Sequence, residues 1–428
     1  MPGSLYHAAS AASLVIVATL AFAGSSAAAP AISGQLLVGF EKGVSKDRQE
    51  RILAAADGRI AQRFSAVRDG RLVVVRPRRG TETKPLRKRL RRADGIAYAE
   101  PDFIYRESKT PDDPFYTLDY GLVDQPDDHD VDAPAAWTTR TGCGKVAILD
   151  TGTDTDHPDL EGNLHKSKDK PNNNKDDDKN GYVDDTYGFN VIKGKGSGED
   201  DEGHGTHVSG IVAAHGNNDQ GISGICWSAK LIPVKFMNSR GKGSSSDAIA
   251  GIEYAVKVGA KVINCSFGTS SKSSALHDAV EFAQKHDTLL VVAAGNDGDN
   301  IDKAPEYPAS FEDPNILAVA ASTSDDTLAS FSNFGSDDVD VAAPGSNIYS
   351  TYLGGGYKTL SGTSMASPLA AGLAAMLRKQ ASNATPGDLR KAISKKVDKP
   401  PALKGKVAHD GRINAAKALK AIKSIVKG

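Results

Sequence analysis

Short apolar runs alternate with helical stretches along most of this 428-residue chain. The runs are rich in Val, Ile, Leu and Ala, as expected of strands that are buried on both faces. This alternation predicts an α/β fold in which a parallel sheet is flanked by helices on both faces, with reactive residues at the carboxyl ends of the strands. We expect strands at Val146–Leu149, Leu231–Lys235, Val262–Cys265, Leu289–Ala293 and Ile316–Val319, and helices at Ser246–Val258, Ser274–Lys285 and Thr363–Lys379.

A smaller domain is expected ahead of this sheet, in residues 30–109. Apolar runs and helical periods follow one another there as strand, helix, strand, helix, strand, which predicts a small α+β sandwich. The sequence KTPDDP at Lys109–Pro114 then indicates an exposed linker, where proteolysis concentrates. The expected strands are Gln35–Phe40, Arg71–Arg76 and a closing strand from Ile96–Ala99 and Phe103–Tyr105, and the expected helices are Arg48–Ala56 and Pro85–Arg92.

The first 29 residues have the layout of a secretory signal. The apolar run Ala11–Ala23 is too short to span a bilayer and leads into small residues, so a signal peptidase could cut after Ala23 or Ala29. The first residues carry no Lys or Arg, which leaves a buried N-terminal helix as the alternative. No later segment is long and apolar enough for an anchor, so we expect a secreted protein in three parts, 1–29, 30–109 and 110–428.

The two large parts carry opposite charge. Residues 30–109 contain 19 Lys+Arg and 10 Asp+Glu, whereas residues 110–428 contain 33 and 43, giving balances of +9 and −10. Segments of opposite sign in one chain should attract each other. The alternative is that the basic segment binds nucleic acid or anionic lipid, but its charges are scattered rather than gathered in a tail. We therefore expect no nucleic-acid partner.

Three cysteines, Cys143, Cys226 and Cys265, are too few for a disulfide scaffold and too dispersed for a zinc site. At most one bridge can form, and the sequence does not select the pair. Cys265 ends a mostly apolar run and is expected to be a small core residue.

Asp150 and His204 have the chemistry of a proton-transfer pair. Asp150 follows an expected strand and precedes a tight Thr-Gly turn, where a carboxylate can orient an imidazole and offset its charge. His204 lies between glycines in GHGTHVSG, and a histidine can take a proton from an alcohol and return it to an amine. Taken alone, Asp150 could be a cap or turn residue. His204 and His207 could likewise form a zinc pair, although no third ligand is evident.

Ser364 and Asn296 could supply a nucleophile and an oxyanion donor. Ser364 lies in LSGTSMASP, where a helix should begin and its dipole favours negative charge. Asn296 follows a strand in GNDG, and an amide fixed there can donate to a tetrahedral intermediate. Taken alone, the two would be a helix cap and a turn. The nucleophile elbow of α/β-hydrolases is excluded, because Ala366 replaces its second glycine and that fold orders the three residues differently.

Together these motifs resemble those of the subtilisin-like serine proteases, the subtilases. The resemblance covers nearly all of residues 110–425, and residues 30–109, which end in YAEPDFIYR, are similar to the family's inhibitory propeptide. One departure is Leu369-Ala370, where the family usually has His-Val, and it should alter packing rather than activity. The matching pieces are DTG at 150–152, HPDL at 157–160, HGTHVSG at 204–210, INCSFG at 263–268, AAGND at 293–297 and GTSMASP at 362–368.

The resemblance implies a monomeric serine endopeptidase that is made as a self-processing precursor and needs no cofactor for catalysis. Ser364 would form an acyl-enzyme, His204 would act as general base and then acid, and Asp150 would hold the imidazole's tautomer. Asn296 and the backbone N–H of Ser364 would form the oxyanion hole. The substrates would be proteins and peptides, and the propeptide would act as an intramolecular inhibitor.

An extended substrate should pair with one strand on each of its sides. The resemblance places these strands at Ser266-Phe267-Gly268 and at Gly241–Ser244, the latter contributing Gly241, Gly243 and Ser244. Asp297 would lie on the rim of the pocket for the P1 residue, which precedes the scissile bond. It could favour Lys or Arg there.

The sequence DDDKNGYVDD at 176–185 begins like a calcium loop. Asp176, Asp178 and Asn180 offer oxygen ligands at alternate positions, and Gly181 permits the turn. The loop is not a full EF-hand, because Tyr187 stands where its last Glu belongs. The alternative is a solvated acidic loop with interleaved lysines. Further candidate ligands in this loop are Tyr182, Asp184 and Asp185.

A second calcium site is implied by the resemblance alone. Its ligands would be the side chains of Asp159 and Asn218 and the carbonyls of Gln220 and Ile222, although the extra Gly216 leaves the register open. Calcium that binds only the folded protein would stabilise it by mass action.

Two other functions stay open at this point. A subtilase-like protein can be a catalytically silent binding protein, but such proteins usually lose a triad residue or the oxyanion amide, and all four are present here. A nucleic-acid or surface-binding protein would use the basic segment Pro85–Arg92, which maturation would remove.

Overall fold

The computed structural model describes residues 31–78, 82–103, 109–123 and 128–427. The chain divides into two compact units, with the boundary between Pro101 and Asp102. The expected signal at 1–29 lies outside the described residues. Among those residues, no helix combines the length and apolar character needed to cross a bilayer.

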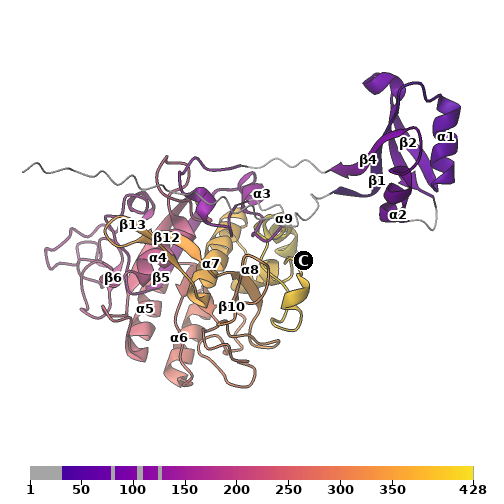
Figure 1. Cartoon of the computed structure of the whole chain (residues 1–428). Coiled ribbons are helices and arrows are strands. Elements are labelled where there is room, and N and C mark those ends of the chain that lie inside the picture. Colours follow the sequence, from indigo (N-terminus) through magenta and orange to yellow (C-terminus); the bar gives the residue numbers. More distant parts are fainter. Residues whose placement is uncertain (1–30, 79–81, 104–108, 124–127, 428) are drawn as a thin grey trace, which may run out of the picture. The chain divides into compact units, whose positions relative to one another are not determined.

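The first unit is a four-stranded sheet with two helices (Figure 1). Its strands lie in the order β2-β3-β1-β4, and β3 pairs antiparallel with both β1 and β2. The small α+β fold is confirmed, but strand β2 was not expected, because its sequence GRIAQRF contains no continuous apolar run. The elements are β1 Ala31–Phe40, α1 Lys46–Ala55, β2 Gly58–Phe64, β3 Leu72–Pro77, α2 Thr83–Leu90 and β4 Ile96–Phe103.

The second unit is built on a seven-stranded parallel sheet in the order β11-β10-β9-β8-β5-β7-β6. Strands β12 and β13 form a separate antiparallel hairpin. The strands are β5 Gly142–Asp150, β6 Phe189–Asn190, β7 Ser228–Lys235, β8 Val262–Cys265, β9 Leu289–Ala293, β10 Ile316–Ser322, β11 Val341–Pro344, β12 Ile348–Tyr352 and β13 Gly356–Leu360. The helices are α3 Ala133–Trp137, α4 His204–Ala213, α5 Ser245–Lys257, α6 Ser274–Lys285, α7 Thr363–Gln380, α8 Pro386–Ser394 and α9 Ala415–Ile425.

Helices cover both faces of this sheet, as the alternating pattern predicts. Successive side chains of a strand point to opposite faces, so Val146 and Ile148 of β5 join a core with α4, α7 and α9. Ala147 and Leu149 join the other core, which α5 and α6 cover while packing side by side (Figure 1). The expected α/β fold is therefore confirmed.

A disulfide joins Cys143 to Cys226, a pair that the sequence left open. It links the start of β5 to the segment between α4 and β7, which are 83 residues apart in sequence. Cys265 is a buried free thiol at the end of β8, and burial raises its pKa.

Candidate active site

Asp150 is the last residue of β5, at the carboxyl edge of the sheet. Its side chain is fully buried, and its Oδ1 accepts a hydrogen bond of 2.7 Å from the N–H of Thr151. The same oxygen lies 2.8 Å from Nδ1 of His204. A buried carboxylate in this position holds the proton on Nδ1 and leaves Nε2 free to accept one.

His204 is the first residue of α4, and the loop before this helix fixes its position. Asp200, which the sequence reasoning missed, accepts hydrogen bonds from the N–H groups of Glu202, Gly203 and Thr206. Gly205 packs so closely on the end of strand β5 that an added Cβ would lie 2.0 Å from the carbonyl oxygen of Gly152. The glycine after His204 therefore brings the ring against Asp150.

Opposing forces act on the charge of His204. Burial of the ring is the largest single influence and disfavours the imidazolium, but the charge and the hydrogen bond of the Asp150 carboxylate oppose it. Glu202 and Asp200 add to this, so that the pKa of His204 is raised to about 9. Glu202 also contacts the backbone of His204, because its Oε2 accepts a hydrogen bond from the N–H of His204 at 2.8 Å. The site thus stabilises the protonated form that follows proton abstraction.

His207 takes no part in a metal pair with His204. Its Nε2 lies 2.9 Å from the carbonyl oxygen of Lys358, and burial lowers its pKa to about 4. The zinc alternative thus finds no support in this geometry.

Ser364 is the second residue of α7, in the first turn of the helix. Its Oγ donates to the carbonyl of Ser266 at 3.3 Å, and among the described residues it makes no hydrogen bond to His204. Catalytic hydrogen bonds are often loose in a free enzyme, and a side-chain rotation of Ser364 changes the partner of the hydroxyl.

A buried polar network ties the end of β8 to the first turn of α7. The Oγ of Ser266 accepts from Asn264 Nδ2 at 2.9 Å and donates to the carbonyl of Ser364 at 3.0 Å. Ser367 Oγ donates to Asn264 Oδ1 at 3.0 Å. Asn264 and Ser367, which sequence reasoning did not single out, thereby fix the backbone of Ser364.

The amide of Asn296 is oriented by its own carbonyl. The Oδ1 atom of Asn296 accepts two hydrogen bonds from Thr363, one from its N–H at 2.8 Å and one from its Oγ1 hydroxyl at 3.0 Å. The Nδ2 atom of Asn296 is therefore free to donate. Asn333, another residue missed from sequence, holds the following loop, because its Oδ1 accepts from the N–H groups of Asp297 and Asp299, each at 3.0 Å. Asp297 itself is exposed.

A cleft of about 630 Å³ extends from His204 between the two expected substrate segments. Ser266, Phe267 and Gly268 continue β8 and line one side of it, and Gly241, Gly243 and Ser244 also line it. The prediction of a strand at 241–244 is wrong, because this stretch is an irregular segment. The reason is local: Gly241 has φ of 65°, and Ser244 caps α5 in a capping box with Asp247.

The structure brings together most of the residues expected at the second calcium site. Asp159 is fully buried and accepts from Asn218 Nδ2 at 3.0 Å and from the N–H of Ile222 at 2.9 Å. The N–H of Gln220 donates to Asn218 Oδ1 at 3.0 Å. Asp113, which no local signal revealed, joins them from far along the chain by accepting from the N–H of Asn217 at 2.7 Å.

The loop at 176–185 divides its expected ligands between two roles. Asp176 accepts from the N–H of Gly181 at 2.8 Å, and Asp184 accepts from that of Asn173 at 2.9 Å, so both carboxylates hold the loop itself. The ring of Tyr182 packs edge-on against Tyr254. Asn180 donates through Nδ2 to Asp185 at 2.9 Å.

The other two expected carboxylates, Asp178 and Asp185, converge with Asp169. Ligand oxygens of the three lie within 4.8 Å of one another. Asp169 and Asp185 are buried, and among the described atoms Asp169 Oδ2 and Asp185 Oδ1 have no hydrogen-bond partner. Buried unpaired carboxylate oxygens are costly, and a calcium ion would satisfy them.

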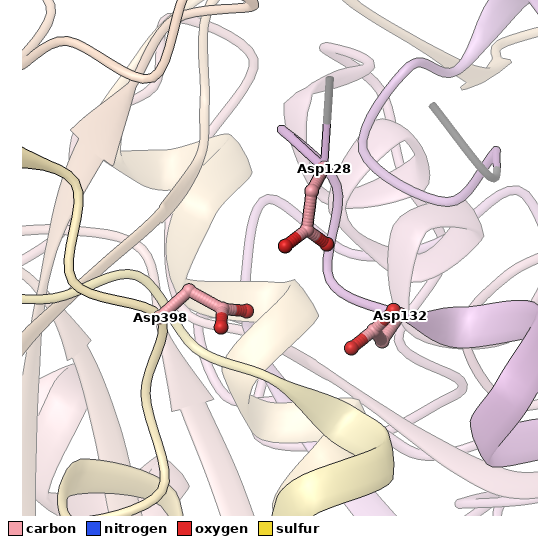
Figure 2. Close-up of side chains that lie close together, drawn as sticks. All are labelled: Asp128, Asp132 and Asp398. Carbon is pink, nitrogen blue, oxygen red and sulfur yellow. The ribbon is translucent and has the colours of Figure 1, made fainter. Parts of the chain in front are cut away.

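A second acidic cluster, of Asp128, Asp132 and Asp398, differs from the first (Figure 2). Asp398 pairs with the cations of Lys417 and Arg412. Asn414 Nδ2 donates to both Asp132 and Asp398, at 2.6 Å in each case. Because Lys417 and Arg412 already offset part of the charge of this cluster, it calls for a metal ion less strongly than the first cluster does.

Known proteins share this architecture. The profile described as Subtilase family matches residues 144–413, and that of the Fervidolysin N-terminal prodomain matches residues 19–102. A thermophilic serine proteinase of Bacillus sp. (strain AK1) is 34% identical over 91% of this chain and 88% of its own. Thermitase of Thermoactinomyces vulgaris is 38% identical over 72% of this chain and 99% of its own. A solved protease structure from Pseudoalteromonas arctica superposes with a TM-score of 0.62 at 30% identity, covering 73% of this chain and 100% of that one.

Proposed function

The chain belongs to the subtilase family of serine peptidases, and we propose that it is a secreted endopeptidase that cleaves proteins through an acyl-enzyme on Ser364. The observation that carries the proposal is the 2.8 Å contact between Asp150 and His204 at one end of the cleft. It pairs a buried carboxylate with an imidazole whose other nitrogen is free to act as a base.

In the proposed reaction the hydroxyl of Ser364 turns toward His204 and attacks the scissile carbonyl. His204 Nε2 takes the hydroxyl proton, and Asp150 stabilises the imidazolium that forms. The oxyanion of the tetrahedral intermediate accepts hydrogen bonds from Asn296 Nδ2 and from the N–H of Ser364. Loss of one such donor costs about 10²–10³-fold in rate.

The second half of the reaction reverses these roles. The intermediate collapses, the C–N bond breaks, and His204 gives its proton to the leaving amine, so that the acyl group remains on Ser364. Water then attacks the acyl-enzyme with His204 again as the base. The ester C–O bond breaks, His204 returns the proton to Ser364 Oγ, and the new carboxylic acid leaves. Main-chain hydrogen bonds to Ser266–Gly268 on one side of the cleft would hold the peptide in an extended form.

The prodomain would act as inhibitor and folding aid until the enzyme removes it. This rests on the match to a subtilase prodomain at 19–102 and on the opposite charge balances of residues 30–109 and 110–428. A signal peptide at 1–29 would direct the precursor out of the cell.

Calcium would stabilise the mature enzyme at two places. Asp169, Asp178 and Asp185 would hold one ion, because two of their buried oxygens otherwise lack a partner among the described atoms. Asp159, Asn218 and carbonyls of Gln220 and Ile222, with Asp113 nearby, would hold the other. The ions would support the fold and would not enter the reaction.

The test is expression and refolding of the purified precursor beside its Ser364→Ala variant. Wild type should lose residues 30–109 and then hydrolyse casein, whereas Ser364→Ala should keep the prodomain and remain inactive. Ser424→Ala, which removes an exposed hydroxyl on α9, should behave like wild type. Equal processing and casein hydrolysis by Ser364→Ala would overturn the proposal.

A further inference from the structure

We propose that Glu306 forms the acidic base of the P1 pocket and that the enzyme therefore prefers Lys or Arg before the scissile bond. The inference rests on the proposed function and adds a substrate class to it. The sequence motifs point only to Asp297 for this role, because Glu306 lies in no motif.

Backbone pairing brings Glu306 to the substrate segment. Thr269 and Tyr307 form an antiparallel bridge, with N–H···O distances of 2.9 and 2.8 Å between them. Glu306 directly precedes Tyr307, and its side chain lies against the backbone of Gly268. A Cβ added at Gly268 would lie 2.5 Å from Glu306 Oε1, so the glycine leaves room for this carboxylate.

The loop that carries the oxyanion donor forms the opposite wall. A Cβ added at Gly295 would lie 3.4 Å from Glu306 Cγ, and Gly295 directly precedes Asn296. Asn333 holds this loop through the N–H groups of Asp297 and Asp299. The side chain of Glu306 thus lies between the segment proposed to pair with substrate and the loop proposed to bind the oxyanion.

Substrate geometry then places the P1 side chain next to this carboxylate. We place the scissile carbonyl between Asn296 and Ser364, with the substrate backbone running along Ser266–Gly268. The P1 side chain then enters the space between this segment and the loop at Gly295. The larger, more apolar part of the cleft, with Phe236, Leu276 and Tyr307, would receive residues farther from the bond.

The charge in this space is uncompensated. Glu306 is half-buried, and among the described residues neither Glu306 nor Asp297 forms an ion pair with Lys or Arg. The pKa of Glu306 is raised, first by burial and then by the negative charge of Asp297. The two carboxylates therefore repel each other. A long cationic side chain would offset the cost of burying the Glu306 carboxylate and the repulsion from Asp297.

The experiment compares kcat/KM for peptide anilides that differ only at P1, with Lys, Arg, norleucine, Phe or Leu, on mature enzyme titrated with a fluorophosphonate. Wild type should favour Lys and Arg over norleucine by about 10- to 100-fold, the range of a charge-assisted hydrogen bond. Glu306→Gln should lower kcat/KM for Lys and Arg so that this ratio approaches one. Asp297→Asn should reduce it by less.

Glu312→Gln, at an exposed carboxylate on the same segment, is the matched control and should keep the wild-type ratio. A wild-type preference for Phe and Leu, or a ratio unchanged in Glu306→Gln, would overturn the inference and leave the proposed function standing. Failure of wild type to cleave any peptide or casein would overturn both.

Discussion

At the scale of single residues, the charge around His204 sets the working pH of the proposed enzyme. The imidazole must be neutral to accept a proton, and the carboxylates of Asp150, Glu202 and Asp200 raise its pKa to about 9 against the effect of burial. Activity should therefore rise with pH as the imidazolium loses its proton. This rising limb of the pH profile should lie at higher pH than it would for an ordinary histidine.

Glu202→Gln should move this limb of the pH profile toward lower pH. The substitution keeps an oxygen that can accept from the N–H of His204 but removes a negative charge that favours the imidazolium. The measurement is kcat/KM against pH, with Glu281→Gln on the exposed face of α6 as the control. A limb that stays in place or moves to higher pH would contradict this account of the site.

Residues within contiguous motifs could be predicted from the sequence, and residues that act through distant contacts could not. DTG, HGTHVSG and GTSMASP each combine a reactive side chain with the glycine that its surroundings require, so Asp150, His204 and Ser364 were all singled out. Asp113, Asp169 and Glu306 carry no local signature. Their proposed roles depend on partners that the fold brings to them from far along the chain.

At the scale of elements, the loop between the short 3₁₀ helix η3, Glu161–Asn163, and β6 shows how a ligand pattern and a folded site can differ. Alternating oxygens predicted Asp176 as the first calcium ligand, but its carboxylate holds the backbone of Asn180 and Gly181. Asp169, upstream of the pattern, supplies the buried carboxylate that meets Asp178 and Asp185 instead.

Calcium should raise the melting temperature of the inactive Ser364→Ala precursor by several degrees. A site saturated a hundredfold above its Kd adds about 2.7 kcal/mol to the free energy of unfolding. Asp169→Asn should remove part of this shift and one bound ion in a calorimetric titration, whereas Asp176→Asn should remove neither. If Asp176→Asn instead removed the shift and the bound ion while Asp169→Asn removed neither, the ligands would be those that the sequence pattern predicts.

Strands buried on both faces were the most predictable elements. β8, β9 and α6 have the bounds that their apolar runs and helical period predict. The polar strand β2 and the stretch 241–244 were misjudged, because the pairing of β2 and the capping of α5 by Ser244 override their local patterns.

At the scale of the whole molecule, the resemblance to subtilases is confirmed for both units, since the family profiles match residues 144–413 and 19–102. The first unit has its own core, where Leu36, Val38 and Phe40 of β1 pack with Leu53, Leu86 and Leu90 from α1 and α2. Residues 30–109, which include most of this unit, carry the net basic charge that opposes the acidic remainder of the chain.

Inhibition of the mature enzyme by residues 30–109, supplied as a separate chain, should weaken as salt rises. Screening reduces attraction between the +9 and −10 segments, although exposed charge pairs are individually weak and apolar contacts should supply most of the affinity. The measurement is the inhibition constant at low and high salt. An unchanged value would show that the charge difference does not contribute.

The central claim is that Ser364 is the nucleophile of a working active site. The most direct test is to treat mature wild-type enzyme with a fluorophosphonate, map the adduct by mass spectrometry and follow casein hydrolysis in parallel. We predict a single adduct on Ser364 and loss of activity in proportion to it. Full activity with Ser364 completely modified, or inactivation with the adduct on another residue, would contradict the claim.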